Sequence, residues 1–313
     1  MSKIAFVFPG QGSQYVGMGK GFYDNVAVSK EMYDIASEAS GMDIPALCFT
    51  ENEELNITKY TQVAMLATEV ALLKAVEEKG FTPAVCGGLS LGEYGALVAS
   101  GVMSPADAFK VVVKRGLYMQ EAVPTGGAMA AVLGLDAAVI EETIAKVEGI
   151  VSIANYNCPG QIVITGEKAA VEKAGELLTV AGAKRVVMLN VSGPFHSKML
   201  TGAGEKLGEV LDTVTIGDVK IPYIANLTAD YVNNDSDIKD LLVQQVSSSV
   251  RWEQSVRLMM KDGVDTFVEI GPGKTINGFI KKITRETGDT VNVINVDNYD
   301  EFEAAMEKLK ELA

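Results

Sequence analysis

Apolar runs alternate along the chain with segments of helical spacing, which is typical of an α/β protein. Residues 4–8 are a short apolar run that ends at "PGQGSQ", as expected of a buried strand entering a tight loop. Residues 60–79 have helical apolar spacing, and "SPAD" at residues 104–107 is a helix-start signal with proline at the first helical position. Further strands are predicted at "PAVCGG", "TFVEIGPG" and "VNVINV". This alternation predicts a mostly parallel sheet covered by helices on both faces.

The middle of the chain has a different pattern. It predicts strands at residues 128–133, "IVSIA", "QIVIT" and "RVVML", with "NYNCPG" as a turn-rich connection and helices at residues 136–147 and 167–181. The order β-α-β-β-α-β is that of a ferredoxin-like unit. Since "PTGG" and "SGP" flank it as linkers, we predict a subdomain of residues 124–195 inserted into an α/β core of residues 1–123 and 196–313.

Composition narrows the class of protein. The 313 residues are 48% hydrophobic and 22% charged, as expected of a soluble globular protein, and the net charge of −14 argues against nucleic acid or an anionic membrane as partner. No apolar stretch approaches the ~20 residues needed to cross a bilayer, and the N-terminal apolar run is too short for a signal peptide.

The cysteines indicate a compartment but no metal site. Cys48, Cys86 and Cys158 are far apart without CxxC spacing, and a single histidine cannot complete a zinc site with them. We therefore expect free thiols, a cytoplasmic location, and neither a metal nor a cofactor.

A candidate nucleophile lies in "GLSLG", where Ser90 stands between Gly88 and Gly92. In many acyl-transfer enzymes this G-x-S-x-G pattern marks a serine on a sharp strand-to-helix turn. Such a serine needs a base, and His196 is the only histidine of the chain. The alternative is a glycine-rich turn with an ordinary serine, together with a structural histidine. No acidic partner for the imidazole is evident, but a backbone carbonyl can orient it.

Two other features bear on binding. Arg115 lies in the mostly apolar stretch "VVVKRGLYMQEA", so it is either a solvated arginine on an amphipathic helix or a buried guanidinium that needs an anion such as a substrate carboxylate. The loop "FPGQGSQYVGMG" fails the G-x-G-x-x-G phosphate pattern at Tyr15 and lacks the GK[ST] ending of a P-loop. We interpret it as a strand-end loop whose backbone amides face the site.

An ordered series of motifs resembles the malonyl-CoA:acyl carrier protein transacylases, the acyltransferases of fatty acid and polyketide synthesis. The series covers nearly the whole chain: "FPGQGSQ", "YTQVAML", "LSLGEY", "KRGLYMQEA", "GAMAAVLG", "ANYNCPGQIVITG", "VSGPFHS", "VRW" and "EIGPG". The resemblance implies an α/β-hydrolase-like core with an inserted ferredoxin-like subdomain. It also implies transfer of malonyl from malonyl-CoA to the phosphopantetheine thiol of acyl carrier protein through a malonyl-serine intermediate.

The resemblance also implies roles for individual residues. Ser90 matches the nucleophile and His196 its base, while the backbone amides of Gln11 and Leu91 match the oxyanion hole. The remaining matches are Arg115 for the malonyl carboxylate, Gln62 as a pocket residue, Phe195 as a bulky residue against an α-methyl group, and Arg251 for a main-chain carbonyl that orients the histidine.

Two positions depart from the family pattern. Leu89 replaces the usual histidine before the nucleophile, and Val63 replaces the usual proline after Thr61-Gln62. Neither change removes a group with an assigned chemical role.

Three other functions stay open at this point. They are loading of a polyketide carrier protein, hydrolysis by a serine esterase or thioesterase, and a non-enzymatic binding module. Because both the chain and the expected carrier protein are acidic, docking needs a local basic patch. The candidates are Lys184, Arg185, Lys198, Lys274, Lys281 and Lys282.

Overall fold

The core is built on a parallel sheet, as the alternating pattern predicts. The computed structural model describes residues 2–191, 193–232 and 235–312, so Ser192 of the predicted linker lies outside the described residues. The sheet has the order β2-β1-β7-β8 with all neighbours parallel. Its strands are β1 (Ile4–Phe8), β2 (Val85–Gly88), β7 (Thr266–Ile270) and β8 (Asn292–Val296).

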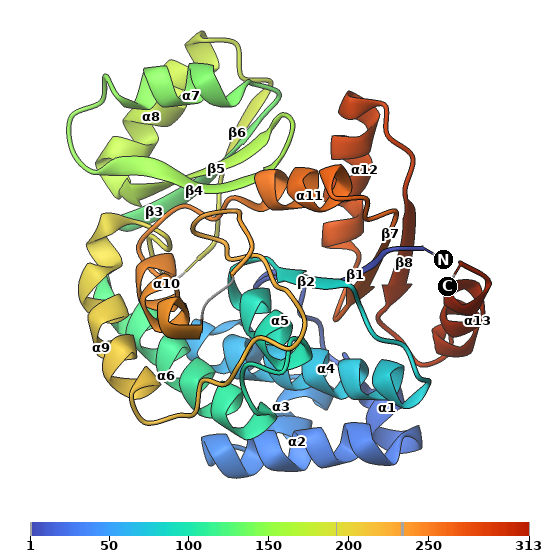
Figure 1. Cartoon of the computed structure of the whole chain (residues 1–313). Helices are drawn as coiled ribbons and strands as arrows, with labels where there is room; N and C mark the ends of the chain where they lie inside the picture. The colour runs from blue at the N-terminus through green and yellow to red at the C-terminus, as the bar shows by residue number, and fades with distance from the viewer. Residues whose placement is uncertain (1, 192, 233–234, 313) are drawn as a thin grey trace.

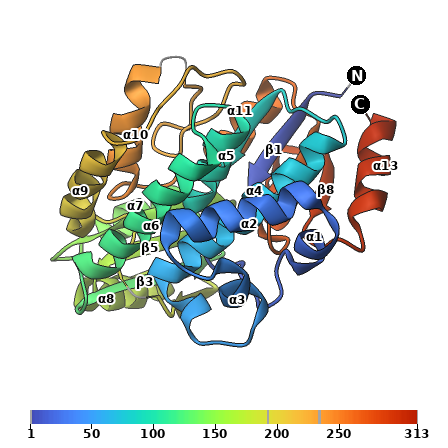
Figure 2. The ribbon, with the colours of Figure 1, turned by 90° about the horizontal axis from the view of Figure 1, so that it is seen from below.

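Helices cover both faces of this sheet (Figure 1). The core helices are α1 (Lys20–Asn25), α2 (Ala27–Ser40), α3 (Ile44–Phe49), α4 (Thr58–Glu78), α5 (Glu93–Ala99), α6 (Pro105–Ala122), α9 (Thr201–Leu211), α10 (Ile238–Gln245), α11 (Trp252–Lys261), α12 (Thr275–Thr287) and α13 (Phe302–Leu312). In Figure 2, α2 crosses in front of α4, on which it packs. The N-cap predicted for α6 is present, since the Ser104 hydroxyl accepts the Asp107 backbone N–H at 3.1 Å.

Strand β1 shows why two helical layers are needed. All five of its residues are buried, and successive side chains of a strand point to opposite faces. Ile4, Phe6 and Phe8 join the apolar cluster formed with α4, α5 and α6, whereas Ala5 and Val7 join the one formed with α11 and α12. A strand that is buried on both faces has a continuous apolar sequence, and β1 has the sequence IAFVF.

The predicted inserted unit forms a separate antiparallel sheet above the core (Figure 1, green to yellow). Its strand order β4-β5-β3-β6 is ferredoxin-like, and α7 (Ala137–Ile144) and α8 (Lys168–Val180) pack on one face. The strands are β3 (Gly127–Leu133), β4 (Val151–Cys158), β5 (Gln161–Glu167) and β6 (Arg185–Met188). These elements lie inside the predicted insert of residues 124–195, whose limits stay a prediction.

Strand β4 is longer than the sequence pattern indicates. We expected "NYNC" to belong to a turn, but it continues the strand to Cys158, and β5 begins at Gln161. The pairing with β5 is irregular at two points, between Ile153 and Asn155 and between Tyr156 and Cys158. These irregularities interrupt the apolar alternation, which explains why the sequence pattern misses the end of this strand.

Strand β3 shows how the subdomain contributes to the site. Ala130 and Val132 pack with α7 and α8, whereas Met129 and Ala131 point to the opposite face and line a pocket over the core.

The cysteines and the helix lengths agree with the sequence analysis. All three cysteines are buried and unpaired. Within the described residues, the helices are too short or too polar to cross a bilayer.

Candidate active site

Ser90 lies on the sharp turn that the G-x-S-x-G pattern predicts. It lies two residues after the end of β2 and has φ of 55°, in the left-handed region that is costly for a residue with a side chain. A Cβ at Gly88 would lie 2.0 Å from the Gly92 carbonyl oxygen, and one at Gly92 would lie 2.2 Å from the Phe8 carbonyl oxygen. Both flanking glycines are therefore required by close backbone approach.

Two side chains from distant segments hold the Ser90 backbone. The Asn226 Oδ1 atom accepts the Ser90 N–H at 2.6 Å, and its Nδ2 donates to the Gly88 carbonyl at 2.6 Å. The Gln245 Nε2 donates to the Ser90 carbonyl at 2.9 Å. The strained turn is thus fixed by hydrogen bonds to both sides of the nucleophile's peptide.

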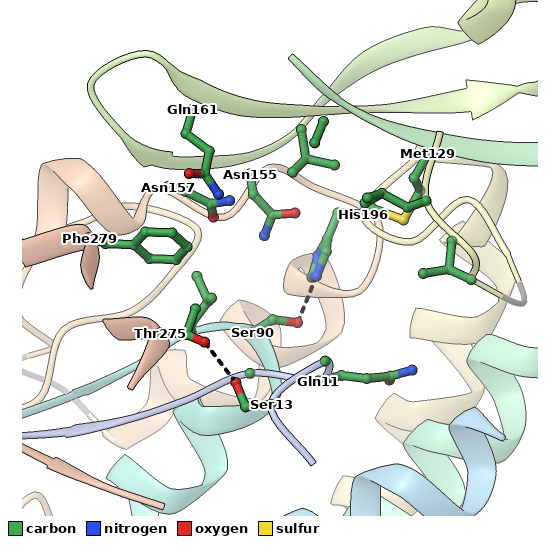
Figure 3. A pocket seen from close by; sticks show the side chains of 17 residues that line it. Gln11, Ser13, Ser90, Met129, Asn155, Asn157, Gln161, His196, Thr275 and Phe279 are labelled. Carbon is green, nitrogen blue, oxygen red and sulfur yellow. Dashed lines mark hydrogen bonds between the residues drawn. The ribbon is translucent and has the colours of Figure 1, made fainter. Parts of the chain in front are cut away.

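The structure brings His196 onto Ser90. The Ser90 Oγ lies 2.7 Å from His196 Nε2, although the residues are 106 positions apart (Figure 3). His196 is itself in the left-handed region, with φ of 59°, and its side chain is buried. This contact is the geometry expected of a serine and its general base.

A backbone carbonyl orients the imidazole, but it is not the predicted one. His196 Nδ1 donates to the Gln245 carbonyl at 2.9 Å, so the proposed role of Arg251 is wrong. Gln245 is the last residue of α10, where helix carbonyls lack partners within the helix. The Arg251 carbonyl stands at the start of α11 and accepts from the Ser255 N–H and hydroxyl.

Hydrogen-bond chemistry fixes the tautomer. A carbonyl can only accept, so the proton of the neutral ring lies on Nδ1 and leaves Nε2 as an acceptor. A guanidinium can only donate, so Ser90 Oγ accepts from Arg115 Nη2 at 3.1 Å and gives its own proton to His196. Burial, and then the nearby Arg115 charge, lower the pKa of His196 to about 4. The ring is therefore neutral at pH 7 and able to take a proton.

Arg115 is the buried guanidinium that its apolar surroundings indicate. It is 1% exposed, and burial lowers its pKa. Its Nη1 donates to Gln62 Oε1 at 2.8 Å, and its Nη2 donates to Gln245 Oε1 at 2.9 Å as well as to Ser90. Gln62 therefore supports the arginine from α4.

The backbone amides of Gln11 and Leu91 lie beside Ser90 in sequence or space. Leu91 directly follows the nucleophile, and Gln11 belongs to the loop after β1 that lines the same pocket. Within the described residues, neither amide donates a hydrogen bond to another part of the chain. The Gln11 side chain points away from Ser90 and donates to Thr58 (Figure 3). Both amides are therefore available to a bound oxygen.

Of three other positions singled out in the sequence, only Leu89 lines the pocket. Phe195 is buried directly before the base and does not line the pocket. Leu89 does line it, so an apolar wall stands where the sequence resemblance predicts histidine. Val63 is buried in the interior of α4, a position at which helical backbone tolerates valine better than proline.

A pocket of about 390 Å³ opens above Ser90 between the subdomain and the core. Figure 3 shows Asn155, Asn157 and Gln161 reaching into it from the subdomain, opposite Thr275 and Phe279 of α12. The lining is mixed, with amide groups near apolar side chains, which suits a long ligand with both polar and apolar parts.

The sequence reasoning missed three residues that organise this site. They are Asn226, Gln245 and Glu93, whose carboxylate is 1% exposed and lies next to both of the others. Glu93 had a signal, because it stands three residues after the nucleophile in a helix that is otherwise apolar. Asn226 and Gln245 follow no pattern of spacing that links them to Ser90.

Comparison with known proteins agrees with this geometry. Residues 5–306 match the acyl transferase domain family. A malonyl CoA-acyl carrier protein transacylase of Bacillus subtilis is 50% identical over 290 residues, which are 91% of this chain and 92% of the relative.

Solved structures place the chain in the same group. The malonyl CoA-acyl carrier protein transacylase of Clostridium perfringens superposes with a TM-score of 0.95 at 44% identity, covering 99% of this chain and 98% of that one. A malonyl-transacylase solved in complex with a type II PKS acyl-carrier protein superposes with a TM-score of 0.94 at 39% identity, covering 98% and 100%. The resemblance found in the sequence motifs is confirmed, and this chain belongs to the acyl transferase family.

Proposed function

We propose that this protein transfers the malonyl group from malonyl-CoA to the phosphopantetheine thiol of acyl carrier protein, through a malonyl ester on Ser90. One observation carries the proposal: the Ser90 hydroxyl contacts both the His196 base and the Arg115 guanidinium. The first contact suits nucleophilic attack on a thioester, and the second suits an acyl group that ends in a carboxylate. Relatives with the matching name support the same activity.

The first half-reaction loads the enzyme. His196 takes the Ser90 proton as the oxygen attacks the thioester carbon. The Gln11 and Leu91 amides stabilise the oxyanion, each by ~3 kcal/mol in the transition state if they resemble known oxyanion donors. The imidazolium then protonates the departing CoA thiolate, which leaves malonyl-Ser90.

The second half-reaction unloads it. The carrier's thiol enters the pocket above Ser90 and gives its proton to His196. The thiolate attacks the malonyl ester, and the Ser90 oxygen recovers the proton from the ring. Neither half-reaction needs a cofactor, because the Ser90 nucleophile and the His196 base both come from the chain.

The acceptor must reach Ser90 through the pocket between core and subdomain. On the α12 side of this pocket, Lys282 donates to Gln161 at 2.8 Å, and Lys281 is its exposed neighbour. We propose these lysines, with Lys274 at the start of α12, as the part of the basic patch that meets an acidic carrier protein. We also propose a cytoplasmic location.

Intact-mass measurement tests this function. Incubation with malonyl-CoA is expected to add one malonyl group to the wild-type protein and none to Ser90→Ala. Addition of a phosphopantetheinylated carrier protein is expected to remove the group and appear as malonyl-carrier. Label on Ser90→Ala contradicts the assigned nucleophile.

Two outcomes distinguish the alternatives. Release of free malonate without any carrier identifies a thioesterase or esterase. Carrier proteins of fatty acid and polyketide synthesis, compared at equal concentration, identify the natural acceptor. The comparison matters because one of the structural neighbours was solved with a polyketide carrier.

A further inference from the structure

Arg115 is buried among neutral partners. The atoms that its N–H groups contact are Gln62 Oε1, Gln245 Oε1 and Ser90 Oγ, none of which is charged at pH 7. Its Nε has no hydrogen-bond partner within the described residues, and the face of Tyr94 lies 5.5 Å from its Cζ. A buried guanidinium without a contacting anion retains a strong attraction for one.

The Gln245 side chain lies between this cation and the buried Glu93 side chain. Its Oε1 accepts from Arg115 at 2.9 Å, and its Nε2 donates to Glu93 Oε2 at 2.7 Å. Burial raises the pKa of Glu93 to about 7, but its Oε2 also accepts the Asn226 backbone N–H, so this oxygen is an acceptor in either protonation state. Since a guanidinium only donates, the amide has a single favourable orientation. The Gln245 oxygen therefore faces Arg115, while Glu93 Oε2 and the Ser90 carbonyl hold its Nε2 on the other side.

The Glu93 carboxylate is itself held in place. The Asn226 backbone N–H donates to the same oxygen, Oε2, at 3.2 Å. Because Glu93 is the first residue of α5, three positions after Ser90, it belongs to the same rigid turn as the nucleophile. Glu93 and Arg115 attract one another only across the interposed amide, so Arg115 stays in place without a direct ion pair.

We propose that Gln245, held by Glu93 and the Ser90 carbonyl, is a positioning residue that holds Arg115 behind Ser90 without neutralising it. An acyl group that carries a carboxylate then supplies the missing anion, and an acyl group without one leaves the guanidinium unpaired. The preference for dicarboxylic acyl groups thus depends on an amide at position 245 as well as on the arginine. This inference rests on the proposed malonyl transfer.

The decisive variant is Gln245→Glu, which keeps the main-chain carbonyl that orients His196. One oxygen of the new carboxyl group faces Arg115 and the other faces Glu93, so the two carboxyl groups are expected to share a proton. The remaining negative charge contacts Arg115 directly and competes with the substrate. The KM for malonyl-CoA is expected to rise at least tenfold, and the ratio of kcat/KM for malonyl-CoA to that for acetyl-CoA is expected to fall at least tenfold. Gln244→Glu, the same change at the exposed neighbouring position, is expected to leave both values within twofold.

Glu93→Gln provides an independent test with a side chain of the same size. An amide at position 93 can donate as well as accept, so Gln245 Nε2 loses its charged acceptor and keeps only the Ser90 carbonyl, and the selectivity ratio is expected to fall at least threefold. Glu69→Gln is the matched control, since Glu69 is also fully buried and its carboxylate has no hydrogen bond to the site within the described residues. Its ratio is expected to equal that of wild type.

The outcomes separate this inference from the proposed function. Equal losses with malonyl-CoA and acetyl-CoA in Gln245→Glu and Glu93→Gln, with the ratio unchanged, overturn the positioning role. They would make both residues part of the general scaffold. Absence of malonyl labelling in the wild-type protein instead overturns the proposed function, irrespective of the variants.

Discussion

The side-chain oxygen of Asn226 accepts the backbone N–H of Ser90 at 2.6 Å, across 136 positions of sequence. The same side chain donates to Gly88, so one buried amide holds both sides of the turn before the nucleophile. The left-handed backbone of Ser90 persists because its surroundings fix it.

Loss of the Asn226 side chain is expected to release this turn. Asn226→Ala leaves the Ser90 N–H and the Gly88 carbonyl without partners, so the free energy of unfolding is expected to fall by about 1–3 kcal/mol. The rate of malonyl-Ser90 formation is also expected to fall, because the Ser90 backbone is no longer held in place. Urea unfolding and single-turnover labelling measure the two effects. The exposed Asn25→Ala is the control, with an expected change within about 0.5 kcal/mol.

The pH dependence of acylation is expected to show a base with a pKa of about 4. Burial disfavours the imidazolium, so His196 stays neutral until the pH falls well below the ordinary histidine value of 6.5. Since the chain has one histidine, NMR titration follows this ring without ambiguity. A midpoint near 6.5 in the folded protein would contradict the buried geometry.

The same shift has a consequence for stability. The pKa of His196 is lower in the folded chain than in the unfolded chain. Between about pH 6.5 and about pH 4, His196 therefore binds a proton in the unfolded chain but not in the folded one. His196 therefore lowers the free energy of unfolding as the pH falls from about 6.5 to about 4, and contributes nothing above that window. The slope is about 1.4 kcal/mol per pH unit. Urea unfolding of wild type and His196→Gln across this range measures it, and parallel curves for the two proteins contradict the shift.

The flanking glycines of the turn are expected to be irreplaceable. In Gly88→Ala the new Cβ would lie 2.0 Å from the Gly92 carbonyl oxygen, so the turn must open. We expect loss of Ser90 labelling and destabilisation of roughly 3 kcal/mol or more, as for other strongly overpacked sites. Gly278→Ala in α12 has open space around the new Cβ and is expected to be stabilising by about 0.5–1 kcal/mol. Thermal unfolding of both variants checks the contrast.

Removal of the Arg115 guanidinium is expected to reduce the preference for malonyl-CoA over acetyl-CoA. Arg115→Ala leaves the malonyl carboxylate without a cation, which costs roughly 2–5 kcal/mol for a buried charged contact. The kcat/KM for malonyl-CoA is thus expected to fall about a hundredfold, and that for acetyl-CoA much less. Arg115→Lys retains the charge but loses the planar fork that contacts both Gln62 and Gln245, so an intermediate ratio is expected. An equal loss on both substrates would identify Arg115 as a structural residue.

The sequence by itself determined the catalytic serine and histidine and the strands of the two sheets. The apolar runs specify the strands of the parallel sheet, since both faces of those strands are buried. The G-x-S-x-G turn identifies Ser90, and the single histidine identifies its base, because each requirement depends on residue type alone. The β-α-β-β-α-β order likewise specifies the second sheet, although the irregular end of β4 was missed.

Only the tertiary structure decided which groups orient the catalytic pair. His196 is held by a carbonyl, and every residue has one, so the sequence could not distinguish Gln245 from Arg251. The choice follows from where α10 ends, since its last carbonyls lack helical partners there. Asn226 and Glu93 became functional in the same way, because side-chain hydrogen bonds between distant segments depend on three-dimensional placement and have no spacing in the sequence.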